Sequence, residues 1–152
     1  MGLNEKIETF KKTLNHVLVE NSAKPIEDFE IKPSENKWSK KEILGHLIDS
    51  AINNIQRFTE IQTFEKPYKI RTYNPDDLVK SNDYQNKNNQ ELLDLWLHLN
   101  HHILHIIKNK AKETLTHQLV LPNGELSDLQ FLIEDYFDHL YHHLNQINPK
   151  WI

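Results

Sequence analysis

The sequence predicts an all-α protein, a four-helix bundle with long crossover connections, and three observations lead to this fold class. The 152 residues include only three glycines, so few positions favour turns. Apolar residues recur at steps of three and four in four separate segments, each of about 20 residues. Two of the intervening segments are long enough to cross the bundle. The length is that of one domain, which we expect to span residues 1–152.

The first helix is predicted over residues 3–21. A single apolar stripe supports it, formed by Leu3, Ile7, Phe10, Leu14, Val17 and Leu18. Pro25 and Pro33 then interrupt the periodicity, so the chain as far as Lys37 is expected to be a connecting loop.

The second helix has the clearest start signal in the chain. Ser39 is followed three residues later by Glu42, the spacing of a reciprocal capping box. Trp38 precedes the cap and can pack on Ile43 as a hydrophobic staple. We predict a helix over residues 40–61.

The third helix is predicted over residues 89–110, after a long connection at 62–88 with little periodicity. A connection of this length in a compact domain is usually functional or partly ordered by short helical turns, and we expect it to form a lid or wall of a pocket. Asn88 can cap the helix, with Glu91 at its third position. The predicted apolar stripe consists of Leu92, Leu95, Trp96, Leu99, Ile103, Ile106 and Ile107.

The fourth helix follows a turn that contains Pro122 and Gly124, with a short strand-like piece on either side. Ser127 and Gln130 have the spacing of a second capping box, so we expect the helix to begin there. Its predicted buried set is Leu129, Leu132, Ile133, Tyr136, Leu140, Leu144 and Ile147.

Composition excludes several classes of function. The chain has no cysteine, which rules out disulfides and thiolate metal sites. It carries 18 basic and 22 acidic residues, a net charge of −4, without a basic tract. Nucleic acid and anionic membrane surfaces are therefore not expected as partners. The absence of a leader and of a membrane-spanning apolar run predicts a cytoplasmic protein.

His139 and His143 stand four residues apart on the fourth helix, which places two imidazoles one turn apart on one face. A pair with this spacing can bind a metal ion, and it can equally be a pair of hydrogen-bonded histidines at the core edge. His46, on the edge of the apolar arc of the second helix, is the best candidate for a third ligand. Three imidazoles suit zinc or nickel and leave a position open, as in catalytic sites.

A second histidine group lies on the third helix. His98, His101, His102 and His105 share one face, largely opposite the apolar stripe. A solvated polar face is the simpler interpretation, and surface binding of nickel or zinc is the alternative. Such a surface site would lack the shaped walls that catalysis requires.

Acidic residues near these histidines have a less specific pattern. Asp49 and Asn53 follow His46 by one and two helical turns, and Asp135 precedes His139 by one. Each could orient a ligand imidazole or act as a base, and each could be an ordinary solvated residue. Among them Asp49 is our candidate for catalytic base or for a residue that orients a ligand.

Three segments resemble the DinB-like family, which includes proteins of the YfiT type assigned as metal-dependent hydrolases and bacillithiol transferases. They are Trp-Ser-Lys-Lys-Glu-Ile-Leu-Gly-His-Leu-Ile-Asp at 38–49, Tyr-Asn-Pro-Asp-Asp at 73–77 and Tyr-His-His-Leu-Asn-Gln-Ile at 141–147. The first is the most specific, and the likeness extends over about residues 3–148. Asn74 departs from the aspartate that is frequent in the family.

The resemblance implies a four-helix bundle, frequently a homodimer, with a divalent metal held by His46, His139 and His143. We therefore expect a metal-dependent enzyme that activates water or a low-molecular-weight thiol, for hydrolysis of a small molecule or for thiol transfer to it. A non-catalytic metal-containing module that binds a small molecule or serves a stress response is the alternative. A protein interaction module built on the histidine face of the third helix ranks last.

Overall fold

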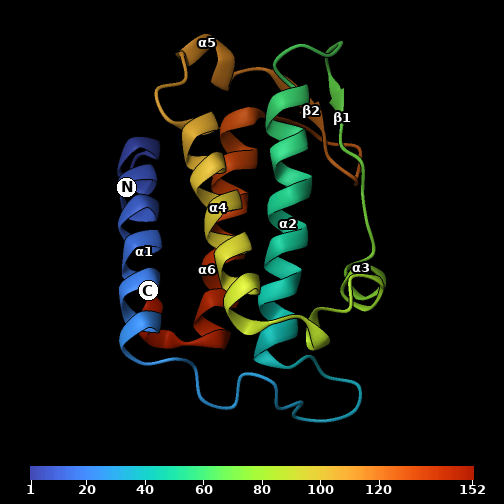
Figure 1. The fold of residues 1–152 in the computed structure, drawn as a ribbon. Coiled ribbons are helices and arrows are strands. Elements are labelled where there is room, and N and C mark those ends of the chain that lie inside the picture. Colours follow the sequence, from blue (N-terminus) through green and yellow to red (C-terminus); the bar gives the residue numbers. More distant parts are fainter.

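The computed structural model describes residues 1–152, and four long helices form its body (Figure 1). They are α1 (Leu3–Ala23), α2 (Lys40–Glu60), α4 (Asn89–Ile107) and α6 (Leu129–Ile147). The predicted four-helix bundle is confirmed, and the helix boundaries agree with the predicted ones to within three residues.

The helices follow an uncommon order around the bundle. α2 packs against α4 and α6, and α1 packs against the same two helices from the other side. Figure 1 shows that α2 and α4 run in one direction, whereas α1 and α6 run in the opposite one. Because α2 and α4 are parallel neighbours, the chain between them must return along the whole bundle, which accounts for the long crossover.

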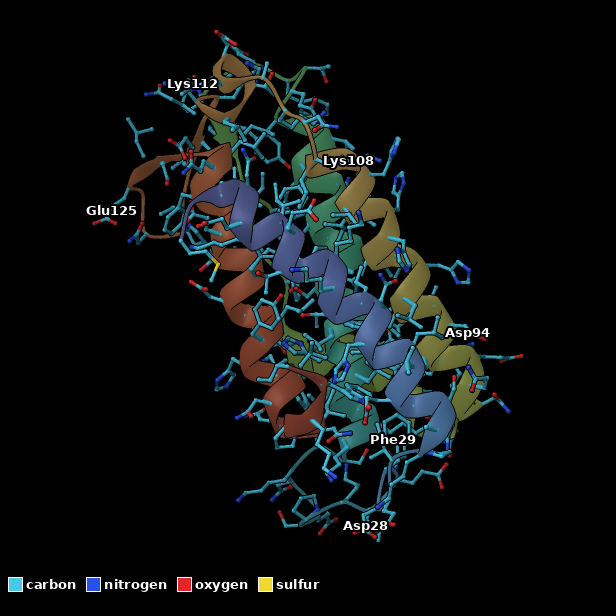
Figure 2. All side chains as sticks on the ribbon, turned by 90° about the vertical axis from the view of Figure 1, so that its left-hand side faces the viewer. Asp28, Phe29, Asp94, Lys108, Lys112 and Glu125 are labelled. Atoms are coloured by element: carbon cyan, nitrogen blue, oxygen red, sulfur yellow. The ribbon has the colours of Figure 1, made fainter.

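Figure 2 shows the bundle from its α1 side. α1 lies obliquely across α4 and α6, which is consistent with its packing against both. Asp28 and Phe29, in the loop before α2, lie at one end of the bundle, and Lys112 and Glu125 lie at the other. The start of α2 and the end of α6 therefore meet at the end of the bundle near Phe29 (Figure 1).

The core largely follows the predicted stripes, with local differences on α4. Leu92, Trp96, Ile103 and Ile107 are buried as predicted, whereas Leu95 is exposed. α4 contacts both α1 and α2, so its buried arc is wider than one stripe and also takes in Leu93, Leu97 and Asn100. A helical-wheel prediction that assumes one packing partner for α4 does not reveal its contact with a second helix.

Two of the three predicted helix starts are confirmed. Ser39 and Glu42 exchange both hydrogen bonds of the capping box, at 3.0 and 2.9 Å. Asn88 Oδ1 accepts from the backbone of Glu91 at 3.0 Å. The third prediction is wrong: Asp128, not Ser127, caps α6, because the strand that contains Ser127 continues to Asp128 and the helix begins only at Leu129.

A small three-stranded sheet lies at the end of the bundle away from Phe29 (Figure 1). Its strands are β1 (Tyr68–Lys69), β2 (Gln118–Val120) and β3 (Leu126–Asp128), in the order β1-β2-β3. β2 and β3 are the predicted strand-like pieces, paired antiparallel around the Pro122 turn. β1, which pairs parallel to β2, was not predicted, because two residues are too few for a periodicity.

Short helical segments order the connections. The crossover contains α3 (Pro75–Ser81) and the 3₁₀ turn η1 (Tyr84–Asn86). α5 (Lys112–Leu115) precedes β2, and η2 (Pro149–Trp151) follows α6. No helix in this protein combines the length and the apolar character that crossing a membrane requires.

Candidate metal centre

Three histidines from two antiparallel helices converge near one end of the bundle. His46 lies in the second turn of α2, and His139 and His143 lie in the second half of α6. One ring nitrogen from each lies within 4.8 Å of the other two, and Nε2 of His46 is 3.0 Å from Nε2 of His139. These three are the group that the sequence predicted as ligands.

The spacing of these nitrogens fits a metal ion. Zinc–nitrogen bonds of about 2.0–2.1 Å in a tetrahedral arrangement place two ligand nitrogens about 3.4 Å apart. The observed separations, from 3.0 Å up to 4.8 Å, lie on both sides of this value, so small side-chain adjustments suffice. The cluster can therefore hold a divalent metal ion.

The three imidazoles are neutral near neutral pH, as metal binding requires. Burial, and after it the repulsion between neighbouring imidazolium charges, lowers the pKa of His46 and of His139 to about 4. Burial also lowers the pKa of His143, against the opposing effect of a hydrogen bond to Gln146. Each neutral ring can thus offer one nitrogen lone pair to a metal ion.

Contacts on the outer ring nitrogens orient two of the ligands. Nδ1 of His143 lies 2.8 Å from Oε1 of Gln146, and this bond requires the proton on Nδ1 and leaves Nε2 free. Nδ1 of His139 lies 3.5 Å from Oγ of Ser50. Nδ1 of His46 is buried without a partner. Partners of this kind fix the tautomer and orientation of a ligand imidazole.

The ring of Trp38 packs on one member of the cluster. The ring of Trp38 packs 5.0 Å from that of His46, so this residue contacts the candidate site rather than serving only as a helix staple. His142, in contrast, is exposed and touches the cluster only through its ring contact with His143, at 4.9 Å. This agrees with the outward direction that the sequence predicted for His142.

Asp49 is buried one turn beyond His46, and its hydrogen bonds go to the crossover rather than to the histidines. Its Oδ1 accepts from the hydroxyl of Tyr84 at 2.6 Å and from the amide of Asn82 at 2.9 Å, whereas its Oδ2 has no partner. Burial raises the pKa of this carboxyl group, and the two hydrogen bonds oppose the rise. The carboxylate thus attaches the crossover to α2 beside the histidines.

The histidines on α4 do not join the cluster. His98, His101, His102 and His105 are exposed, on the solvated face that the sequence predicted, and the rings of His102 and His105 stack at 6.3 Å. Asn74, also considered from the sequence, caps α3 by accepting from the backbone of Asp77 at 3.1 Å.

Sequence reasoning missed several residues around the cluster. Ser50 and Gln146 were accessible to it, because each lies one helical turn or less from a predicted ligand. Tyr84 was not, because no periodicity marks a residue of a 3₁₀ turn as a neighbour of α2.

Comparison with known proteins identifies the family. The family model described as the DinB superfamily matches residues 12–147. The chain belongs to the DinB superfamily. One DinB relative, the protein named Putative metal-dependent hydrolase BH0277 of Halalkalibacterium halodurans, is 26% identical over 118 residues, which are 78% of this chain and 68% of the relative.

Solved structures share the DinB fold. YfiT from Bacillus subtilis, described as a probable metal-dependent hydrolase with an unusual four-helix bundle topology, superposes with a TM-score of 0.81 at 18% identity, over 97% of this chain and 85% of YfiT. The mycothiol-dependent maleylpyruvate isomerase and a point mutant of that enzyme superpose with TM-scores of 0.74 at 13% and 12% identity. This chain spans 61% of those longer proteins, so at such identities the likeness shows the fold alone.

Proposed function

We propose that this DinB protein is a metal-dependent enzyme that binds one divalent metal ion through His46, His139 and His143. The observation that carries the proposal is the convergence of three neutral imidazoles, two of them oriented by hydrogen bonds to their outer nitrogens. Three protein ligands are typical of catalytic rather than structural zinc sites, because they leave a position open.

The metal we expect is zinc or nickel, because the donor set is nitrogen only and imidazole suits both ions. Such an ion acidifies a bound water or thiol, which supplies a nucleophile near neutral pH. His46, with an exposed fraction of only 4%, helps to exclude solvent from the cluster. Hydrolysis and thiol transfer both fit this chemistry, and the designation of two relatives as metal-dependent hydrolases supports the first.

Asp49 is our candidate for a residue that assists the reaction. Its unpartnered Oδ2 could accept a proton, and its raised pKa favours such a role. Through Oδ1 it also positions Tyr84 and Asn82 beside the histidines. Asp49→Asn would retain most of the positioning and remove the base, so a fall in kcat with little change in the melting temperature would support catalysis by Asp49.

Metal stoichiometry tests the proposed site. Protein purified without an affinity tag is analysed for bound metal, as wild type and as His46→Ala, His139→Ala and His143→Ala. We expect about one ion per chain in the wild type and a loss of affinity of at least about 100-fold in each variant. The matched control is His98→Ala/His102→Ala on the exposed face of α4. Metal that stays bound after all three cluster histidines are replaced would refute the site.

Turnover separates an enzyme from a binding module. The metal-loaded protein is incubated with ester and amide panels, and with low-molecular-weight thiols plus electrophiles. We expect activity with one small-molecule class, lost in His46→Ala. Retention of a small molecule without turnover would favour the alternative, a metal-containing module that only binds.

We also propose that the protein is a homodimer, as is frequent in the family. Light scattering of the purified protein measures its oligomeric state directly.

A further inference from the structure

Arg57 is a half-buried cation without an ion-pair partner. No carboxylate oxygen lies within 4.0 Å of its guanidinium, although five other ion pairs form in the protein. Nη2 of Arg57 donates a hydrogen bond to the carbonyl oxygen of Arg71 at 2.8 Å, and Nε of Arg57 is buried with no partner. A cation that is partly removed from water and not compensated costs stability, which calls for a functional explanation.

Arg57 lies in line with the histidine cluster on α2. Eleven residues separate it from His46, and at about 100° per residue this is about 20° more than three full turns. Ser50 and Asn53 lie between them on the same line, at about 40° and −20° from His46. The face of α2 that meets α6 therefore carries a polar stripe, about 16 Å long, from His46 to Arg57.

Tyr73 of the crossover joins the two ends of this stripe. The guanidinium carbon of Arg57 lies 5.7 Å from the centre of the Tyr73 ring. Burial raises the pKa of Tyr73, and the nearby hydroxyl of Ser50 opposes this rise, so the Tyr73 hydroxyl lies on the Ser50 side of the stripe. Ser50 in turn contacts Nδ1 of His139. A row of polar side chains thus leads from the candidate metal centre to Arg57.

The surroundings of Arg57 leave its charge available. The titratable groups that act on it are Tyr73, Tyr68, Asp135 and Arg71. Asp135 is the only carboxyl group among them, and it forms no ion pair with Arg57. Arg71 is exposed and adds a second positive charge. The local charge therefore favours an anion that comes from outside the protein.

We propose that Arg57 and Tyr73 form a subsite for a carboxylate group of the small-molecule substrate whose reacting atom lies at the three-histidine centre. The proposal rests on the proposed function, because it assigns a substrate class to that centre. A guanidinium presents paired N–H donors that match a carboxylate, and partial burial strengthens the interaction. The stripe and the reach of the arginine side chain imply a carboxylate about 10–16 Å from the reacting atom.

Direct binding of two matched probes tests the subsite. The probes are 8-mercaptooctanoate and its neutral carboxamide, which share the thiol and the chain and differ in the charged end. Their dissociation constants are measured by calorimetry on zinc-loaded and on metal-free protein. We expect the zinc-loaded wild type to bind the carboxylate about 10- to 100-fold more tightly than the amide, the range for charge-assisted hydrogen bonds.

The variants separate Arg57 from a general effect of charge. Arg57→Gln is expected to remove the preference for the carboxylate, because it weakens binding of the charged probe far more than binding of the neutral one. Arg71→Gln, the matched control, makes the same substitution at an exposed neighbour and is expected to keep the preference within about threefold. Arg57→Lys keeps a charge that can reach the Arg71 carbonyl. It is expected to fold even if Arg57→Gln does not and to lose most of the preference, because an ammonium lacks the paired donors.

The outcomes distinguish this proposal from the proposed function. If zinc strengthens the binding of both probes but the wild type shows no preference for the carboxylate, or Arg57→Lys retains all of it, the subsite is refuted and the metal centre stands. If zinc changes neither affinity but the preference is present and depends on Arg57, the subsite stands and the metal centre fails as the site of the reacting thiol.

Discussion

Gly45 lies where the crossover touches α2 beside the histidines, and replacing it with alanine should displace the crossover. A Cβ atom at this position would be 2.8 Å from Cβ of Tyr84 and closer still to the carbons of its ring. Real Cβ contacts are not this short, so either Tyr84 or the helix must move. The same tyrosine donates the 2.6 Å hydrogen bond to the buried carboxyl group of Asp49.

The size of the effect follows from three contributions. Forcing an extra carbon into a packed contact costs about 1–3 kcal/mol. Removing a hydrogen bond from a buried carboxylate costs about 1.5–3 kcal/mol. Alanine is better than glycine in a helix by about 1 kcal/mol, which opposes the other two. Gly45→Ala should therefore lower the free energy of unfolding by about 1.5–5 kcal/mol.

A double-mutant cycle with Tyr84→Gly makes the test specific, because glycine also removes the Cβ atom of Tyr84. Without the tyrosine side chain the new methyl group meets no obstacle, so Gly45→Ala should then raise the free energy of unfolding by about 1 kcal/mol. Urea denaturation of the four proteins gives all the values needed. A substitution that destabilises both backgrounds equally, or that is neutral in the wild type, would refute the contact and the attachment of the crossover that depends on it.

Three further predictions concern the site and the core. In the metal-free protein, the pKa of about 4 for His46 lies below the unfolded value of about 6.5, so the unfolded chain binds more protons between these values. The free energy of unfolding should therefore fall by about 2–3 kcal/mol as the pH drops from 6.5 to 4, and comparison with His46→Ala in urea denaturation isolates this contribution. Gln146→Leu removes the oxygen that accepts the hydrogen bond from Nδ1 of His143, and it should weaken zinc binding about 10- to 100-fold in a competition assay with a chelator. Asn100→Ala should cost about 2–4 kcal/mol in urea denaturation, because it leaves the buried hydroxyl of Tyr136 without its 2.6 Å partner, and adding Tyr136→Phe should recover part of the loss.

The four helices could be predicted because each carries its signal locally. A stripe such as the one containing Phe10 and Leu14 repeats over five turns, and caps such as Ser39 and Asn88 act within three residues. Asp128 shows where this local reasoning ends. Ser127 has the better cap pattern, but strand pairing with β2 continues one residue further, to Asp128, and the sequence does not display that pairing.

The residues of the candidate site could likewise be predicted only where their signal is local. Spacing alone placed His139 and His143 on one face, and the apolar arc of α2 together with the resemblance to a known family added His46. Nothing local indicated that Asp49 would turn its carboxylate toward Tyr84 and Asn82, because both come from a crossover whose path depends on the whole bundle. Side chains that approach a helix from a loop are set by tertiary packing, which periodicity does not report.

The proposed metal centre lies where α2 packs against α6. Each helix of a bundle normally buries an apolar stripe against its neighbour. Beside apolar pairs such as Phe58 and Tyr136, α2 presents His46 and Ser50 on this contact, and α6 presents His139 and His143; Arg57 continues the polar stripe of α2 and contacts Tyr73 of the crossover. Such a stripe buries polar groups, among them the unpartnered Nδ1 of His46 and Nε of Arg57, at a cost in stability. The crossover covers the stripe with Tyr73, so the orphaned groups lie under a covering segment next to the cluster. If a metal ion at one end and a carboxylate at the other satisfy these groups, then both ligands together should raise the melting temperature by more than either alone, and this gain should vanish in Arg57→Lys.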